Sequence, residues 1–485
     1  MALNNLLKNQ HLLWRAGFGP AVEQLGDLSH FTPQQFYKAL IKASNKKPDY
    51  IDVADDYLKG LVMGIQEIGR QQKKELDADE KKMVQQKNRQ GVRNLNMYWM
   101  HEMVNTASQL REKLAFFWHG HFACRNLNVF YQQGLLDIIR RNALGSFRDM
   151  LHEVSKSAAM LIFLNNQQNK KDHPNENFAR EVMELFTMGR GNYSEGDIKE
   201  AARAFTGWST GLNGEFIFRR FQHDFGNKTI LGKTGNYDGD EVLDIILSHK
   251  QTAKFITGKI YKFFVNEQLD PEKVDWLAER FYNSTYDIGK LMEDIFTSDW
   301  FYDSKNIGTR IKSPIELMAG IQRMLPMKLE TEESLTFLQR ALGQVLFYPP
   351  NVAGWPGGKT WIDSSSLMLR MRLPQLINDV DQLNVNAKDD DDQMMGRKNT
   401  ESSVKQMGLA RRSIIKADIE WEQYINHFDK IQKDKLLNSL AANLLQTENS
   451  IDEKLIAGYA DTGSKEKFIK SATLQIMSTP EYQLC

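Results

Sequence analysis

The chain has only two cysteines among 485 residues, Cys124 and Cys485, which excludes a disulfide framework and a cysteine-rich zinc site. It also has no excess of either charge, because 62 lysines and arginines balance 62 aspartates and glutamates. A whole-molecule field that would attract nucleic acid or an anionic membrane is therefore absent. We expect no nucleic-acid partner.

Long hydrophobic runs are missing as well. No stretch approaches the roughly 20 apolar residues that a membrane-spanning helix needs, and residues 1–10 contain no apolar run of signal-peptide length. We therefore expect no membrane span and a cytoplasmic location, or an exported protein if a leader has been removed.

The composition that is present favours a folded helical protein. Hydrophobic residues make up 41% of the chain, which supports a sizeable core. Amphipathic stretches separated by glycine and asparagine, with few alternating β-branched runs, predict a mainly α fold. We expect a large helical domain over residues 1–383, a flexible acidic and polar loop over 384–404, and a C-terminal helical section over 405–485 that packs on the main domain.

One small β-hairpin is expected over residues 214–235. Residues 216–218 and 229–231 are apolar or β-branched, and they flank the turn-forming residues 224–227. The sequence Gly232-Lys233-Thr234 in this segment resembles a phosphate loop, but the preceding glycine is at 226 instead of the required 227. We therefore expect no nucleotide.

His119 and His121 lie two apart in the apolar, aromatic run REKLAFFWHGHF of residues 111–122. A buried imidazole needs a partner for each ring nitrogen, either protein groups or a bound ion. Residues two apart point about 200° apart on a helix, so both rings reach one metal only if the helix ends by Gly120. Glycine commonly ends helices, so we predict that end. The alternative is that the rings only cap the helix terminus.

Residues 175–189 predict a helix of about three turns, with Asn175 able to cap its start and Gly189 its end. Glu181 and Glu184 fall beside its apolar stripe, at the edge of the core. They are candidate metal ligands or a general acid and base. Arg180 projects to the other side and is a further candidate catalytic residue. The competing interpretation is a structural ion-pair network with Arg203, Arg180 or Arg111.

His223 and Asp224 are a third candidate pair, since a polar loop can bring an imidazole and a carboxylate toward a site held by helices. A simple turn is the alternative. Residues 348–361 predict a rigid aromatic loop, because three prolines fix φ and the glycines permit close approach. Such a loop either walls a pocket or packs on the core.

Several segments together resemble one bacterial family, the uncharacterised family catalogued as domain of unknown function 1800. They are HLLWRAGFG at 11–19, WHGHF at 118–122, NENFAREVMEL at 175–185, AFTGW at 204–208 and NVAGWPG at 351–357. The resemblance implies no established reaction. It does imply a protein partner, because members are often encoded beside a protein that looks like the sulfatase and alkaline-phosphatase group.

Two hypotheses follow. The first is a metal-dependent enzyme, hydrolytic or oxidative, in which His119, His121 and Glu181 or Glu184 bind zinc, iron or manganese and His223 or Asp224 assists. The second is a non-catalytic helical partner or maturation protein for the sulfatase-like or phosphatase-like protein, with an apolar surface patch. A metal-free acid and base enzyme using Glu181 and Glu184 ranks last, because carboxylates three apart on a helix point the same way.

Overall fold

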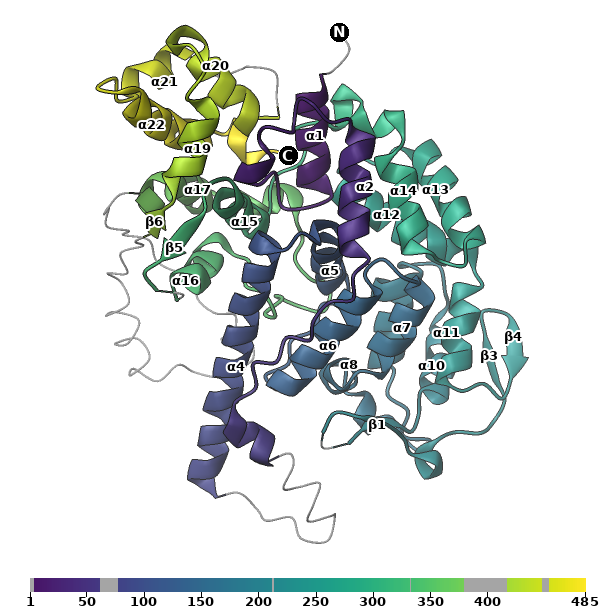
Figure 1. Cartoon of the computed structure of the whole chain (residues 1–485). Coiled ribbons are helices and arrows are strands. Elements are labelled where there is room, and N and C mark those ends of the chain that lie inside the picture. The colour runs from purple at the N-terminus through teal and green to yellow at the C-terminus, as the bar shows by residue number, and fades with distance from the viewer. Residues whose placement is uncertain (1–3, 62–76, 212, 332, 379–416, 447–452) are drawn as a thin grey trace.

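The structure is a computed structural model, and it describes residues 4–61, 77–211, 213–331, 333–378, 417–446 and 453–485 (Figure 1). Helices make up most of these residues. Those before the middle of the chain are α1 (Asn5–Arg15), α2 (Pro33–Ser44), α4 (Ala78–Asn105), α5 (Gln109–His121), α6 (Val129–Asn142), α7 (Phe147–Lys156), α8 (Ala158–Phe163), α9 (Asn177–Glu181), the π-helical turn η3 (Val182–Thr187) and α10 (Glu195–Ala204). Those after it are α11 (Gly239–Leu247), α12 (Lys250–Phe264), α13 (Pro271–Asn283), α14 (Ile288–Phe296), α15 (Pro314–Met324), α16 (Glu333–Leu342), α17 (Ser364–Asn378), α19 (Trp421–Phe428), α20 (Lys433–Leu444), α21 (Glu453–Tyr459) and α22 (Lys465–Met477).

The strands among the described residues form three small antiparallel sheets of two strands each. They pair β1 (Trp208–Thr210) with β2 (Phe216–Phe218), β3 (Lys228–Ile230) with β4 (Lys233–Gly235), and β5 (Met327–Leu329) with β6 (Ala417–Ile419). Short 3-10 turns complete the connections, at Val22–Gln24, Asn166–Gln168, Arg220–Gln222, Asp299–Tyr302, Ser304–Asn306, Gly358–Trp361 and Glu481–Gln483. The prediction of a mainly α fold with small β insertions is confirmed.

The predicted pairing of the hairpin over 214–235 is wrong. The segment 216–218 pairs with the preceding strand, β1, and the segment 228–230 pairs with the following strand, β4. Two hairpins therefore replace the expected one. Leu231 and Gly232, with φ of 49° and 81°, form the two-residue turn between β3 and β4. The sequence that resembles a phosphate loop is therefore a hairpin turn and its following strand.

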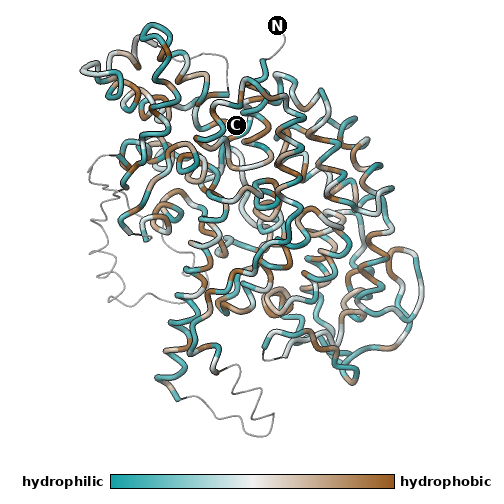
Figure 2. Tube along the Cα trace, viewed as in Figure 1, coloured by the Kyte–Doolittle hydropathy of each residue, from teal (hydrophilic) through white to brown (hydrophobic). Residues whose placement is uncertain are grey.

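One helix, α5, lies in the middle of the molecule (Figure 1), and all of its residues except Gly120 are buried. A helix that is buried on all sides must give each polar residue a partner. Glu112 accepts hydrogen bonds from Trp99, Arg111 and Arg140, and Lys113 pairs with Glu316. By contrast, the buried residues of α4 all lie from Gly91 onward, and Figure 2 shows its other half as largely hydrophilic.

The elements after residue 416 pack against the N-terminal and middle parts of the chain. In this region α20 contacts α1, α22 contacts α17, and β6 completes a sheet with β5. The last residues also pair with an earlier segment, because the backbone N–H of Arg310 donates to the carbonyl of Cys485 at 3.0 Å and that of Cys485 donates back at 2.7 Å. The predicted loop over 384–404 lies outside the described residues, so the domain boundary stays a prediction.

The described helices include none that is both long enough and apolar enough to cross a membrane.

Candidate functional site

His119 and His121 both belong to the last turn of α5, so the predicted helix end at Gly120 is wrong. The helix continues because the N–H of Phe122 still donates to the carbonyl of Trp118, at 2.8 Å. Two positions in one helix separated by 200° direct their side chains to opposite sides. The two imidazoles accordingly have different neighbours and do not converge on one point.

His119 holds the loop that follows α16. Its Nε2 accepts a hydrogen bond from the backbone N–H of Phe347, at 3.1 Å, and its ring packs among those of Trp99, Phe347 and Trp355. Phe347 has φ of 68°, a strained value for a bulky side chain, and this bond stabilises that conformation. Burial lowers the pKa of His119 to about 3, so the ring is neutral and its Nε2 stays an acceptor.

His121 holds the end of the π-helical turn instead. Its Nε2 donates to the carbonyl of Phe186 at 3.1 Å, and its Nδ1 accepts from Nζ of Lys259 at 3.3 Å. Lys259 also donates to the carbonyl of Leu185, at 3.0 Å. The two side chains thus satisfy carbonyls that a helix terminus leaves without partners. Burial lowers the pKa of His121 well below its usual value and that of Lys259 to about 8.

The helix predicted over 175–189 is present as α9 followed by the π-helical turn η3. Its two glutamates have no ion pair with the arginines proposed as their partners. Those arginines form ion pairs with other carboxylates: Arg180 with Glu176 and Glu195, Arg203 with Glu200 and Asp224, and Arg111 with Glu112. The predicted network with Glu181 and Glu184 is therefore wrong, and Arg180 is a half-exposed surface ion-pair residue.

Glu184 and Glu181 have different environments. Glu184 accepts a short hydrogen bond from the Tyr193 hydroxyl, at 2.5 Å, and burial together with this bond raises the pKa of Tyr193. Partial burial, and next the neighbouring Glu184 carboxylate, raise the pKa of Glu181. A half-buried carboxyl with a raised pKa is suited to proton transfer. Neither carboxylate bonds to His119 or His121 in the described structure.

The described parts of the chain contain no group of three or more histidine, cysteine, aspartate or glutamate side chains placed to hold one metal ion. For the predicted set this follows from the geometry of its members. Both Nε2 atoms of His119 and His121 are already engaged in protein hydrogen bonds, and the two rings lie on opposite sides of α5.

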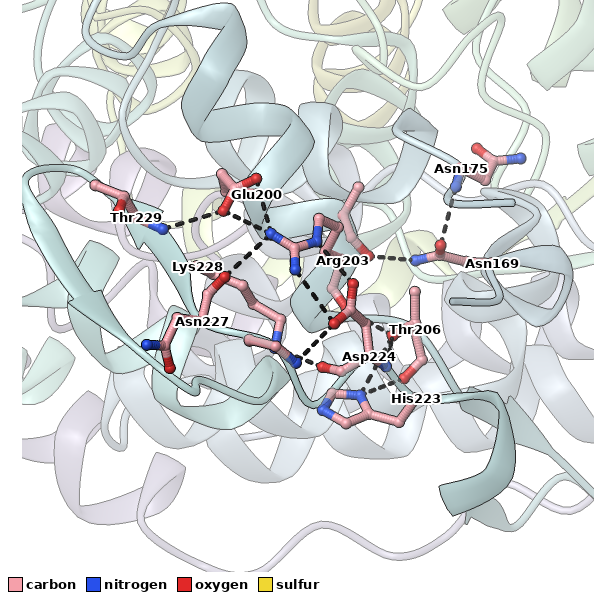
Figure 3. Close-up of polar contacts among 12 residues, drawn as sticks. Asn169, Asn175, Glu200, Arg203, Thr206, His223, Asp224, Asn227, Lys228 and Thr229 are labelled. Atoms are coloured by element: carbon pink, nitrogen blue, oxygen red, sulfur yellow. Dashed lines mark hydrogen bonds and ion pairs between the residues drawn. The ribbon is translucent and has the colours of Figure 1, made fainter. Parts of the chain in front are cut away.

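His223 and Asp224 lie together in a network centred on Arg203, which we call the Arg203 clasp (Figure 3). Arg203 donates hydrogen bonds to both carboxylate oxygens of Asp224, from Nε at 2.7 Å and from Nη2 at 3.2 Å, and its Nη1 donates to Glu200. His223 donates from Nδ1 to the carbonyl of Thr206, at 2.9 Å. The Arg203 guanidinium lowers the pKa of Asp224, and burial lowers that of His223.

The Arg203 clasp fixes the loop that runs from β2 to β3. The buried amine of Lys228 closes it by donating to the carbonyls of Asp224 and Gly226, at 2.5 and 3.0 Å. At its other end Arg219 donates its N–H to the carbonyl of Gly207 at 2.7 Å. Gly207 has φ of 80°, and a Cβ there would lie 2.7 Å from the carbonyl of Arg219, so only glycine permits this approach.

The fixed loop carries an exposed set of side chains that we call the aromatic–basic loop, consisting of Phe218, Arg219, Arg220, Phe221 and Phe225. Phe221 is 92% exposed, and Phe225 and Phe218 are 49% and 41% exposed. The guanidinium of Arg220 lies over the Phe225 ring at 5.4 Å. Sequence reasoning missed this surface, although the unusual run FRRFQHDF at 218–225 was a visible signal.

The predicted aromatic loop over 348–361 packs on the core. A Cβ on Gly354 would lie 2.3 Å from the carbonyl of Gly120, so the loop backbone sits directly against the end of α5. Trp355 lies against the His119 ring and Trp361 is buried. Of the two alternatives left open by the sequence, the described contacts favour packing.

These features define a mainly α protein in which His119, His121 and the His223–Asp224 pair serve three separate packing networks, while Arg180, Glu181 and Glu184 lie apart from them and the aromatic–basic loop is exposed. The chain belongs to the family described as protein of unknown function (DUF1800), whose model matches residues 11–484. No curated protein and no solved structure matches it.

Proposed function

We propose that this chain is a non-catalytic helical partner protein that binds another protein through the aromatic–basic loop. The observation that carries the proposal is the 92% exposure of Phe221 on a loop held by the Arg203 clasp. Exposing an aromatic ring to water costs free energy that binding to a partner recovers. A loop already fixed in place loses little conformational entropy when it binds.

The charge of the loop supports a partner with acidic groups around an apolar pocket. Arg219 and Arg220 are exposed, and within the described residues neither forms an ion pair. Aromatic and arginine side chains together are the residues enriched at the energetic centres of protein interfaces. Family resemblance points to the sulfatase-like or alkaline-phosphatase-like protein that is encoded beside such chains.

The test is to purify that neighbouring protein and titrate it against this chain by isothermal calorimetry. We expect Phe221→Ala to weaken binding by at least about tenfold, as truncation of an interface anchor does. Tyr98→Ala is the matched control, because Tyr98 is a 60% exposed aromatic residue on α4, far from the loop in sequence. Undiminished binding by Phe221→Ala, or equal losses in both variants, contradicts the proposal.

The same preparation discriminates this role from a metal-dependent hydrolytic or oxidative enzyme. Elemental analysis of protein purified without chelator would find a near-stoichiometric ion, lost in both His119→Ala and His121→Ala, if the enzyme hypothesis held. The partner-protein proposal expects His121→Ala to lower stability through the loss of its bond to the Phe186 carbonyl while partner affinity is kept in the folded fraction.

A further inference from the structure

Buried polar atoms without hydrogen-bond partners concentrate around α1 and the last residues of the chain. Such atoms are rare in folded proteins, and each calls for a physical explanation. In the described residues they include side-chain atoms of Asn9, Gln10, Arg15, Arg370, Tyr482 and Gln483. The concentration in one region points to a common cause.

The same region holds an excess of buried positive charge. Five buried cationic side chains, Arg15, Lys113, Arg310, Lys312 and Arg370, surround the buried carboxylate of Glu316. Burial lowers the pKa of Arg15 and of Arg370 to about 10 and that of Lys312 to about 7. Buried charges persist only when they are paired, so this cluster needs more negative charge than Glu316 supplies.

Glu316 is already saturated by its nearest partners. Its Oε1 accepts from Lys113 at 2.5 Å and from Arg310 at 2.9 Å, and its Oε2 accepts from Arg310 at 3.0 Å and from the Ser313 N–H at 2.8 Å. A negative charge at Cys485 also favours the charged forms of Arg15, Lys113, Arg310 and Lys312. For Arg370 the favourable charge comes from Glu316, which forms no hydrogen bond to it.

Arg370 presents an unused binding edge. Its Nη1 donates to the Lys312 carbonyl at 3.0 Å and to Oε1 of Gln483 at 3.4 Å, while its Nε and Nη2 have no partner. Nε and Nη2 lie on one edge of the guanidinium, the edge that binds two oxygens of a carboxylate or phosphate. The amide of Gln483, whose Oε1 accepts from Nη1 of the same guanidinium, has a further buried donor without a partner, Nε2.

Other buried arginines in this chain differ. Arg140 uses all three of its nitrogens, on Glu112, Glu102 and the carbonyl of Asp49. Arg323 donates from Nε to the Gly19 carbonyl at 2.9 Å and from Nη1 to the Val104 carbonyl at 2.6 Å. Within the described residues, Arg370 leaves Nε and Nη2 together without partners, whereas Arg15 leaves Nε and Nη1, which do not share one edge of the guanidinium.

We propose that the chain binds one inorganic oxyanion, phosphate or sulfate, inside the fold, held by the free edge of Arg370 and the amide of Gln483. A tetrahedral oxyanion accepts several hydrogen bonds at once and supplies the missing negative charge, whereas water could satisfy the donors but not the charge. Because Gln483 follows α22 and Arg370 lies on α17, the anion fastens the last residues to the middle of the chain.

The experiment starts from full-length protein purified in chloride buffers. The protein is denatured, and the released anions are identified and counted by ion chromatography, which separates phosphate from sulfate. We expect close to one equivalent of a single oxyanion per chain. We also expect the melting temperature to be higher in phosphate or sulfate than in chloride at equal ionic strength.

Arg370→Met should abolish both the released anion and the oxyanion-specific rise in melting temperature. Arg323→Met is the matched control, since it removes another buried arginine, whose Nε and Nη1 are bonded, and it should keep both the anion and the rise. Gln483→Glu provides a second variant if Arg370→Met does not fold, because its carboxylate would pair with Arg370 and replace the anion. Wild-type protein with no bound oxyanion and no oxyanion-specific rise overturns the proposal, as does retention of the anion by Arg370→Met.

Discussion

At the scale of single residues, Arg203 is the side chain on which the aromatic–basic loop depends. It joins α10 to the loop through both oxygens of Asp224. It also bonds Glu200 on the same helix, which accepts from the N–H of Thr229 at 3.1 Å. Loss of one guanidinium therefore leaves two partly buried carboxylates without their cation.

We expect Arg203→Met to lower the free energy of unfolding by about 1–3 kcal/mol, because charge-assisted hydrogen bonds in partly buried positions are lost. Arg180→Met is the control, since Arg180 also bonds two carboxylates, those of Glu176 and Glu195, but at the surface. Exposed pairs contribute about 0–1 kcal/mol. Urea unfolding of the two variants measures the difference, and equal losses would show that the Arg203 clasp adds no more than a surface pair.

The residue types at the candidate site were predictable from the sequence, but their partners were not. The sequence showed that His119 and His121 would be buried and would need partners for their ring nitrogens. Those partners are the Phe347 N–H and the Phe186 carbonyl, which come from segments 228 and 65 residues away. No local pattern encodes such distant backbone groups, so the sequence was compatible both with a metal ion shared by the two rings and with separate protein partners for each ring.

At the scale of elements, the loop from Gly343 to Trp361 packs on the end of α5, where the backbone of Gly354 lies against that of Gly120. We expect Gly354→Ala to cost more stability than Gly357→Ala, although both glycines have positive φ, 79° and 74°. A Cβ at 354 meets the Gly120 carbonyl at 2.3 Å, whereas a Cβ at 357 meets nothing within 4 Å. Backbone strain at positive φ costs about 1–3 kcal/mol at either position, and the clash adds roughly 1–3 kcal/mol at 354 alone.

Differential scanning calorimetry of the two glycine variants tests this expectation. A lower melting temperature for Gly354→Ala than for Gly357→Ala would support close docking of the loop on α5. Equal melting temperatures would mean that the loop lifts from α5 without cost, and that its conformation is set by φ alone.

Helices were easier to predict than strand pairs, for a physical reason. Helix signals are local, and the predicted start at Asn175 is only two residues early, because α9 begins at Asn177, whose N–H donates to the Asn175 side chain at 3.0 Å. The strands are only three residues long, and nothing within Phe216 to Phe218 specifies whether it pairs with residues before or after it. The π-helical turn could not be predicted from the sequence either. It is stabilised by the Thr187 hydroxyl, which donates to the Val182 carbonyl at 2.6 Å, and by the capping groups His121 and Lys259, which come from distant helices.

At the scale of the whole molecule, the described core is one continuous hydrophobic cluster that runs from α1 to the residues after α22. The length and the hydrophobic content of the chain made a large helical core predictable. Its charged interior was not predictable, because Lys113, Arg310 and Glu316 meet only when α5 and α15 pack near each other. Stability of the whole fold should therefore respond strongly to pH.

Three histidines that are fully buried should make the protein less stable as the pH falls below about 6.5. Burial lowers the pKa of His11, His119 and His121, so the folded protein leaves them neutral, while the unfolded chain takes up protons near pH 6.5. The unfolded state then binds more protons, and the free energy of unfolding falls with pH by up to roughly 4 kcal/mol per unit for three such groups. Urea unfolding at pH 7.5, 6.5 and 5.5 gives this slope. His119→Gln keeps an acceptor for the Phe347 N–H without titrating, so it should reduce the slope by about one third, and an unchanged slope would show that His119 is protonated in the folded protein.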